Sequence, residues 1–334
     1  MALNELWFFI VGFLFIGYFV LDGFDFGVGM SLPFLGKDDT DRRVLINTIG
    51  PVWDLNETWV LVAGASLFAA FPEWYASLFS GFYLALLLIL LALIARGVAF
   101  EYRGKEDSLK WRKTFDWMIT IGSAVPALLW GVAFANIVQG VPLNADHVYT
   151  GNLFTLLNPY GLLGGLVTLT LFFTHGLVFI TLKTEGEIRD RARTLALKSG
   201  LVTVVLAASF LAWTLIAHFT VMGLALSLVA AVSLVGALLG AYLKRDGVSF
   251  GLLVLTIASA VLSLFMALYP NVLPSTTDPA FSLTITNASS SDYTLTVMSW
   301  VVLCCLPLVL VYQAWTYWVF RNRVSRKSIP QGSH

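Results

Sequence analysis

The chain has 334 residues, of which 58% are hydrophobic and 12% are charged, and its 20 Lys and Arg residues balance its 20 Asp and Glu residues. Soluble proteins carry about 25% charged residues, so this chain has too little polar surface to cover a water-facing globule. A net charge of zero also argues against nucleic acid as a partner. We therefore expect an all-α integral membrane protein with one polytopic domain over residues 1–334.

A helix that crosses the membrane needs about 20 mostly apolar residues. Residues 199–243 contain no charged side chain and are too long for one span, so we expect a hairpin whose turn lies near His218–Gly223. About nine spans are predicted, and besides the two of this hairpin they cover approximately Leu6–Val28, Pro51–Phe71, Glu73–Arg96, Asp116–Gln139, Asn158–Leu182, Phe250–Leu268 and Leu295–Phe320.

These spans divide the chain into three parts. Residues 1–140 hold helices one to four, residues 141–270 hold helices five to eight, and residues 271–334 hold helix nine and a C-terminal tail. The expected packing is two four-helix bundles plus one extra helix.

The basic residues predict the orientation of the chain, because Lys and Arg concentrate in cytoplasmic loops. With this threading, basic clusters follow every odd-numbered helix and begin at Lys37, Arg103, Lys183, Lys244 and Arg321, whereas the loops on the other side carry none. We therefore expect the N-terminus outside and the C-terminus in the cytoplasm.

Four carboxyl groups and one arginine lie inside the predicted spans. Asp22 and Asp25 are three residues apart near the end of the first helix, and Asp54 and Glu57 have the same spacing in the second helix, so each pair shares a helix face. Arg96 ends the third helix on the same side of the membrane. One arginine cannot neutralise four carboxylates, and burial disfavours the charged form, so we expect some of the acids to hold protons. The cluster predicts either a proton path or a salt-bridge network that fixes the helix ends.

Potential metal ligands are scarce in the predicted spans. Of the four histidines, His175 alone lies clearly inside a span, and we interpret it as a hydrogen-bonded core residue. Haem irons are commonly held by His, Cys or Met, and one histidine does not build a centre with several haems. Cys304 and Cys305 are predicted to be packed core thiols. We expect no catalytic or metal site in this chain.

Several sequence motifs resemble those of one membrane enzyme family. Asp22–Met30, Arg42–Trp59, Arg96–Arg103 and Leu295–Trp300 occur in order and are similar to subunit II of the cytochrome bd quinol oxidases. The resemblance covers essentially the whole chain and is most specific over residues 22–103. Residues 183–251 match less well and are shorter than in the family.

The resemblance implies a subunit of a respiratory enzyme that oxidises quinol and reduces dioxygen to water. This chain would pair as a heterodimer with subunit I, which holds two b-type haems and one d-type haem, in a bacterial plasma (inner) membrane. A small single-helix accessory subunit and a structural quinone held by this chain are left open.

The resemblance also implies roles for individual residues. It associates Asp54 with proton delivery, for which Glu57, Asp25 and Asp22 are further candidates. It associates Trp59 with a hydrophobic route for oxygen, whereas Trp53 would support this site by packing and Arg96 by charge balance. Two alternatives stay open, namely a proton-coupled secondary transporter and a metal-free structural subunit of a haem-copper oxidase.

Overall fold

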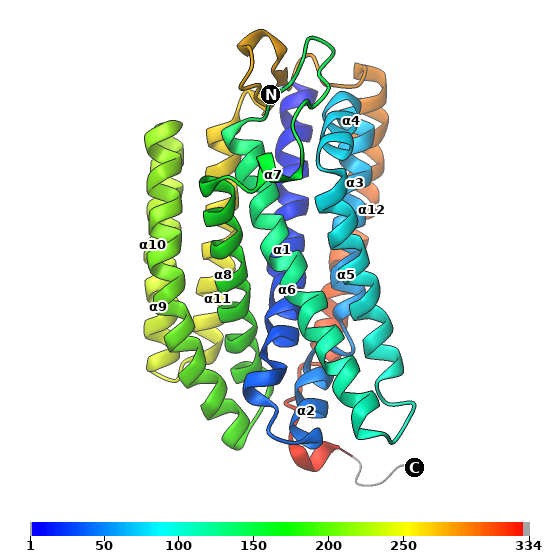
Figure 1. Cartoon of the computed structure of the whole chain (residues 1–334), viewed down its shortest axis with the longest axis vertical. Coiled ribbons are helices and arrows are strands. Elements are labelled where there is room, and N and C mark those ends of the chain that lie inside the picture. The colour runs from blue at the N-terminus through cyan, green and yellow to red at the C-terminus, as the bar shows by residue number, and fades with distance from the viewer. Residues whose placement is uncertain (1, 330–334) are drawn as a thin grey trace.

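The computed structural model describes residues 2–329, and most of these residues lie in helices that run along the long axis of the molecule (Figure 1). The part of the expected tail beyond Ile329 lies outside the described residues. The α-helices are α1 (Leu3–Leu35), α2 (Asp39–Ile49), α3 (Trp53–Ala70), α4 (Pro72–Gly81), α5 (Tyr83–Tyr102), α6 (Leu109–Gln139), α7 (Leu153–Leu156), α8 (Pro159–Lys183), α9 (Gly186–Ala217), α10 (Val221–Tyr242), α11 (Asp246–Leu268) and α12 (Asp292–Val319). The remaining elements are the short antiparallel strands β1 (Asn271–Leu273) and β2 (Leu283–Thr284) and the 3-10 turns η1 (Pro279–Phe281) and η2 (Arg326–Ser328).

Eight of the described helices are long and apolar enough to cross a membrane: α1, α5, α6, α8, α9, α10, α11 and α12. The second of the nine expected spans corresponds to α3, which has 18 residues and carries Asp54 and Glu57 in its first turns. This helix is therefore less apolar than the other eight, although it runs alongside them and packs on α1 (Figure 1). The expected all-α membrane fold is confirmed.

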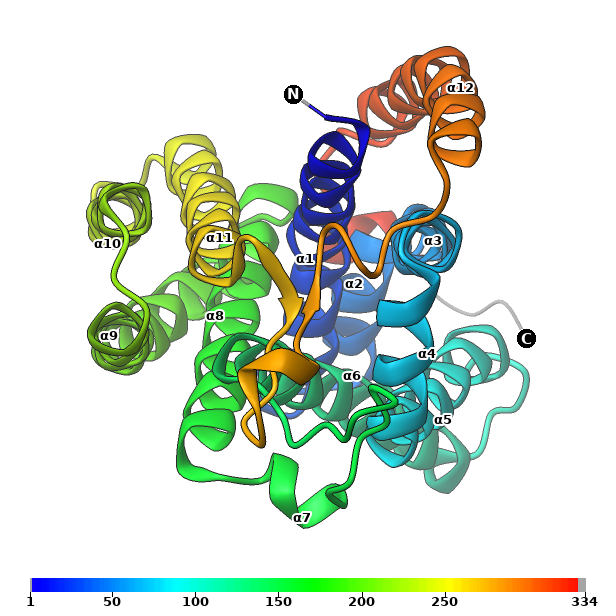
Figure 2. The ribbon, with the colours of Figure 1, turned by 90° about the horizontal axis from the view of Figure 1, so that it is seen from above.

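The long helices form two groups of four with one helix outside them, as expected. Seen from above, α1, α3, α5 and α6 form one group and α8, α9, α10 and α11 form the other, whereas α12 stands at the periphery (Figure 2). Because α1 and α6 also pack against α8, both groups share a continuous hydrophobic core. We call these groups the first bundle and the second bundle.

Glycines permit the closest approach between the bundles. A Cβ atom on Gly27 of α1 would lie 2.0 Å from the Phe172 carbonyl oxygen of α8, and one on Gly176 would lie 2.4 Å from the Gly27 backbone. Between α6 and α8, a Cβ on Gly131 would lie 2.3 Å from the Gly164 carbonyl oxygen. Such contacts between small residues drive helix packing in lipid, where hydrophobic burial contributes little.

Three predictions about local structure were wrong. The third span does not run from Glu73 to Arg96: the chain leaves the helical conformation at Phe82, where Tyr149 lies against Gly81, so that α4 and α5 are separate helices. The segment after α1 is not a loop but the helix α2, which begins where the Asp38 side chain accepts a hydrogen bond from the Asp41 backbone N–H. Cys304 and Cys305 are exposed rather than packed in the core, because α12 buries very few of its side chains.

The basic loops gather at one end of the molecule, which we call the basic end. Arg326 binds Asp38 at 2.7 Å and Asp41 at 2.5 Å, and Arg191 of α9 also reaches Asp41 at 2.8 Å. These ion pairs join three basic segments that are far apart in the sequence. The Asp41 backbone N–H and then the Arg326 guanidinium hold the pKa of Asp38 below its usual value.

Candidate functional site

The first turns of α3 carry polar side chains on two different faces of the helix. At 100° per residue, Asp54 and Glu57 share one side, whereas Asn56 and Trp59 lie close together on a different side. The first face looks into a groove beside α5, and the second face contacts α1 and α12. This segment therefore connects two distinct polar environments near the basic end.

A fully buried ion pair joins α1 to α5. The Arg96 guanidinium donates to Asp22 at 2.7 Å, and both side chains are completely shielded from solvent. Arg96 also lies over the rings of Phe26 and Phe100, with distances of 4.6 Å and 5.6 Å from its Cζ atom to the ring centroids. Within residues 2–329, Asp22 Oδ2 and the Nε and Nη1 atoms of Arg96 find no hydrogen-bond partner. The pair thus retains unused donors and an unused acceptor in a dry environment.

Asp25 is held by a hydrogen-bonded chain that reaches α12. Asn56 Nδ2 donates to Asp25 at 2.8 Å, and Asn56 Oδ1 accepts bonds from Tyr317 at 2.7 Å and from Gln313 at 3.3 Å. Gln313 in turn accepts a bond from Trp59 Nε1 at 2.8 Å. Asn56 therefore fixes one oxygen of Asp25, while the other, Oδ1, has no partner in the described chain.

Asp54 and Glu57 lie at one end of an open groove between α3 and α5 that has a volume of about 600 Å³. Asp54 is exposed, whereas Glu57 is half-buried and its Oε2 atom is shielded without a hydrogen-bond partner among the described residues. Glu57 follows Asp54 by three residues on the same side of α3. In burial it is intermediate between the exposed Asp54 and the fully buried pair of Asp22 and Arg96.

The expected acidic cluster thus exists, and its members differ in depth. Asp54 is exposed, Glu57 is half-buried, and Asp22, Asp25 and Arg96 are fully buried. Arg96 lies well inside α5 rather than at its end. The four acids do not form one mutually bonded group, because Asp22 pairs with Arg96 whereas Asp25 pairs with Asn56.

The two tryptophans of the α3 motif lie outside the acidic groove. The Trp53 ring packs against Phe100, with 5.1 Å between ring centroids. The Trp59 ring covers Gly17 of α1 so closely that a Cβ there would lie 2.2 Å from it. Trp59 is 8% exposed and forms part of the contact between α1, α3 and α12.

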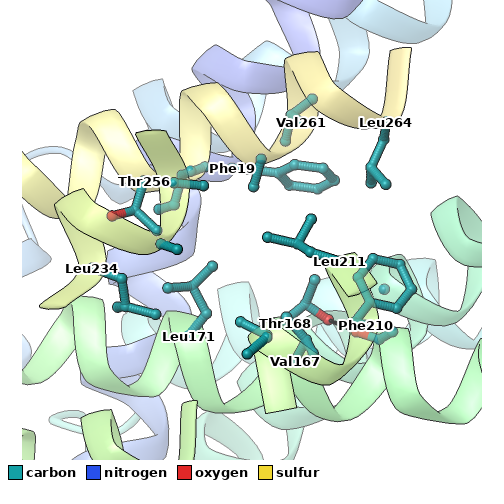
Figure 3. Close-up of a pocket in the computed structure, with 18 of the residues that line it drawn as sticks. Phe19, Val167, Thr168, Leu171, Phe210, Leu211, Leu234, Thr256, Val261 and Leu264 are labelled. Carbon is teal, nitrogen blue, oxygen red and sulfur yellow. Dashed lines mark hydrogen bonds between the residues drawn. The ribbon is translucent and has the colours of Figure 1, made fainter. Parts of the chain in front are cut away.

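The second bundle encloses an apolar cavity of about 120 Å³ (Figure 3). Its walls come mainly from α8, α9, α10 and α11, and the polar side chains among them are Thr168 and Thr256. Both hydroxyls donate to backbone carbonyl oxygens, those of Ala127 and Leu252. The lining therefore suits an apolar chain but offers no free donor for a quinone oxygen, so these residues do not fit a quinone head group.

His175 has the packing of a core residue. Its Nε2 atom lies 3.0 Å from the Val20 carbonyl oxygen, and its ring is stacked on Phe250 with 4.9 Å between centroids. The Nδ1 atom is shielded and has no hydrogen-bond partner among the described residues. Among residues 2–329, no three His, Cys, Asp or Glu side chains are grouped so that they could hold a metal ion.

Sequence reasoning missed the polar residues that orient Asp25. Asn56 is completely buried and is the hub of the hydrogen-bonded chain, and Gln313 and Tyr317 reach it from α12. A signal for them was present, since Gln313 and Tyr317 are one helical turn apart at the end of an otherwise apolar span. Polar residues inside a span usually need partners on a neighbouring helix.

Comparison with known proteins identifies similar chains over the full length. Residues 3–320 match the family model described as cytochrome bd terminal oxidase subunit II. The chain is 46% identical over 331 residues to cytochrome bd ubiquinol oxidase subunit 2 of Bacillus subtilis, with 98% of each chain covered. It is 39% identical over 371 residues to cytochrome bd-I ubiquinol oxidase subunit 2 of Escherichia coli K12, with 100% of this chain and 98% of that one covered.

A solved structure supports the fold. The structure titled as bd oxidase from Geobacillus thermodenitrificans superposes with a TM-score of 0.79 and covers 96% of this chain and 99% of that one. Because the two sequences are 16% identical, this likeness concerns the architecture alone.

Proposed function

This chain belongs to the family of cytochrome bd terminal oxidase subunit II. We propose that it delivers protons from the cytoplasm to a haem-bearing subunit I and that it helps oxygen to reach that subunit. The chain is a component of a quinol oxidase and a multi-pass membrane protein, as its family and its eight apolar helices indicate. Membership of this family removes the grounds for a stand-alone transporter or a haem-copper oxidase subunit.

The wider assembly follows from the same premise. Subunit II pairs with subunit I, and the proposed complex is a heterodimer in the bacterial inner membrane that oxidises quinol and reduces dioxygen. The haems, two of b type and one of d type, would be ligated by subunit I. We assign no quinol site to this chain.

The observation that carries the proton proposal is the graded burial of the carboxyl groups. Asp54 is exposed near the basic end, Glu57 is half-buried one helical turn further, and Asp22 and Asp25 are fully buried. Unpaired acids in a membrane interior are costly and are usually retained for function. A proton taken up at Asp54 would move inward to Glu57, which lies on the same side of α3.

The proposed direction of transfer depends on the orientation of the chain. The basic loops gather at the end where α3 begins, which supports a cytoplasmic location for Asp54 and for the mouth of the groove. Protons would then enter from the side that energy conservation requires. Arg96 would balance the charge of Asp22, and Glu57 and Asp25, which have no ion pair among the described residues, are the proposed proton carriers.

Substitution of Asp54 by Asn tests this route in the assembled oxidase. We expect quinol oxidase turnover to fall about tenfold or more, equivalent to about 1.4 kcal/mol on the rate-limiting barrier. The haem absorption spectrum and heterodimer yield should stay normal, because Asp54 is exposed and its removal leaves no buried charge unpaired.

The matched control is Glu106→Gln, which removes an exposed acid from the loop between α5 and α6 at the same end of the molecule. The control should retain full turnover. Normal turnover in an intact Asp54→Asn complex would remove Asp54 from the proton route. An equal loss in both variants would point to surface charge in general rather than to a specific path.

Oxygen access is proposed to follow the apolar surface beside Trp59. Its ring closes the contact between α1 and α3, and Phe13, which lies 6.1 Å away between ring centroids, is 42% exposed on the outer surface. Dioxygen is apolar and partitions into such regions rather than into the charged groove. The measurable consequence is the apparent KM for oxygen of a Trp59 variant.

A further inference from the structure

A second pocket, of about 630 Å³, lies at the basic end and has no part in the proposed proton route. It is formed where the C-terminal ends of α8 and α12 meet the turn before α3 and the start of α11. Its lining is of two kinds. Phe179, Leu182, Phe250 and Phe320 are apolar, whereas Lys183, Arg321 and Arg323 are basic.

The three basic side chains at this pocket lack acidic partners. Within the described residues, Lys183, Arg321 and Arg323 have no carboxylate within ion-pair distance, and the pocket lining contains no Asp or Glu. They donate instead to backbone carbonyl oxygens: Lys183 to Asn322 at 3.1 Å, Arg323 to Leu182 at 3.2 Å and Arg321 to Trp318 at 2.6 Å. A backbone carbonyl orients a cation but does not cancel its charge.

Other arginines at the same end contrast with this group. Arg103 binds Asp116 and Asp39, and Arg193 binds Asp246, each at 3.0 Å or less. Part of the positive charge at the basic end is therefore neutralised internally, and the three cations of the pocket are among those left for an external anion. An arginine or lysine binds a phosphate group through charge-assisted hydrogen bonds.

Beyond the pocket, α12 presents an apolar surface. Seen from above, α12 stands apart from α11, with the N-terminal half of α1 between them (Figure 2). Leu308 and Val311 on α12 are 72% and 69% exposed in this chain. An occupant of the pocket could therefore place a charged group against the three cations and extend apolar chains along the helices.

We propose that this pocket binds the phosphate-bearing head group of an anionic phospholipid such as phosphatidylglycerol, with its acyl chains lying along α12. Basic pockets between helices on the cytoplasmic side recognise anionic lipid head groups in this way. The apolar wall favours a lipid over a free phosphate ion, which would leave Phe320, 45% exposed, uncovered. The lipid would hold the C-terminal end of α12 against α8, which compensates for the small buried surface of α12.

Native mass spectrometry of the assembled oxidase tests this proposal. The detergent-purified complex is titrated separately with palmitoyl-oleoyl phosphatidylglycerol and palmitoyl-oleoyl phosphatidylcholine, and the Kd of the tightest lipid site is measured. The variant Arg321→Gln/Arg323→Gln should bind phosphatidylglycerol about 25-fold more weakly, at about fivefold per charge near the membrane surface. The wild type should bind phosphatidylcholine weakly.

The control is Lys110→Gln/Lys113→Gln, which removes the same charge from exposed positions outside the pocket and should leave the tightest site unchanged. Arg321→Gln alone provides a milder variant, because Arg321 contacts only the Trp318 carbonyl and ring of its own helix among its described hydrogen bonds and ring contacts. Its heterodimer yield reports on folding separately from lipid binding.

Equal weakening in the control, or equal binding of phosphatidylcholine and phosphatidylglycerol, would overturn the proposal. Displacement of phosphatidylglycerol by millimolar inorganic phosphate would also overturn it, because the site would then recognise a free anion. The lipid titration requires no turnover, so its result is distinguishable from failure of the proton route.

Discussion

The two bundles of this chain differ in their buried polar groups. In the second bundle, hydroxyl side chains bond across helix pairs: Tyr160 to Thr214 at 2.7 Å and Ser227 to Ser263 at 2.8 Å. Its shielded atoms without a partner among the described residues are nitrogens of His175, Arg191 and Arg193. In the first bundle, Asp22, Asp25 and Glu57 each keep a shielded carboxylate oxygen without a partner in the described chain, and the guanidinium of Arg96 keeps shielded nitrogens without one. The unpartnered acids among the described residues therefore lie in the first bundle.

This contrast indicates where function is located. A buried donor or acceptor without a partner costs about 1–3 kcal/mol, and more when it is charged. Hydroxyl pairs between helices contribute about 0.6 kcal/mol on average and can be exchanged with little loss. The first bundle thus retains groups that weaken it, which is explicable if they transfer protons. The second bundle supports the first through the close contact of α1 and α6 with α8.

The largest effect should follow from removal of the fully buried countercharge of Asp22. Arg96→Ala leaves Asp22 unpaired in a fully shielded position, which costs about 3–5 kcal/mol. We expect a much lower yield of assembled heterodimer and a lower midpoint of thermal unfolding in detergent. Adding Asp22→Asn to Arg96→Ala removes the stranded charge and should restore part of the lost stability.

The control lies in the second bundle. Arg189→Ala removes a partly exposed partner of Asp246, but Arg193 still binds that carboxylate at 3.0 Å, so the loss should be at most about 1 kcal/mol. Normal yield and stability of the Arg96→Ala complex would show that the ion pair does not hold the first bundle together. Loss of a buried ion pair in the first bundle would then cost no more stability than loss of a partly exposed one in the second.

Much of the architecture was predictable from the spacing of charged and apolar residues. The hairpin turn between α9 and α10 lies at the predicted place, because a charge-free stretch of 45 residues exceeds one span. The break at Phe82 was not predictable, because it depends on Tyr149, a residue distant in sequence that lies against Gly81.

The site was predictable in membership but not in connectivity. The identity of Asp22, Asp25 and Arg96 followed from their positions in apolar spans, because ionisable residues stand out there, whereas Arg96 lies well inside α5 and not at the helix end where it was predicted. The role of Asn56 could not be predicted in this way, because it depends on which face of α3 turns toward α12, and tertiary packing decides that. The exposure of Cys304 could not be predicted for the same reason, since sequence alone did not show that α12 stands at the periphery.

An intermediate effect is expected for the tryptophan that connects α3 to α12. Trp59→Phe keeps an aromatic ring over Gly17 but removes the donor to buried Gln313, which should cost about 1–3 kcal/mol. If oxygen passes beside this ring, the apparent KM for oxygen should change while turnover at saturating oxygen is retained. Oxygen consumption measured at a series of oxygen concentrations separates these two quantities.

Trp213→Phe is the matched variant in the second bundle. Trp213 is 45% exposed and packs beside Tyr160, far from the acids in the sequence and on the other bundle. It should leave the apparent KM for oxygen unchanged. An unchanged KM in the Trp59→Phe oxidase as well would assign Trp59 to packing alone and separate the oxygen route from the first bundle.

The smallest effect should come from the hydroxyl pair between α10 and α11. Ser227→Ala removes one partner of Ser263, which still donates to the Gly223 carbonyl oxygen at 3.1 Å. No buried group is stranded, so the stability should fall by about 0.6 kcal/mol and turnover should be unchanged. Thermal unfolding and quinol oxidase assays on the same preparation measure both. A large loss of turnover with normal haem content would mean that the second bundle also takes part in proton transfer, because a satisfied hydroxyl would then matter for more than helix packing.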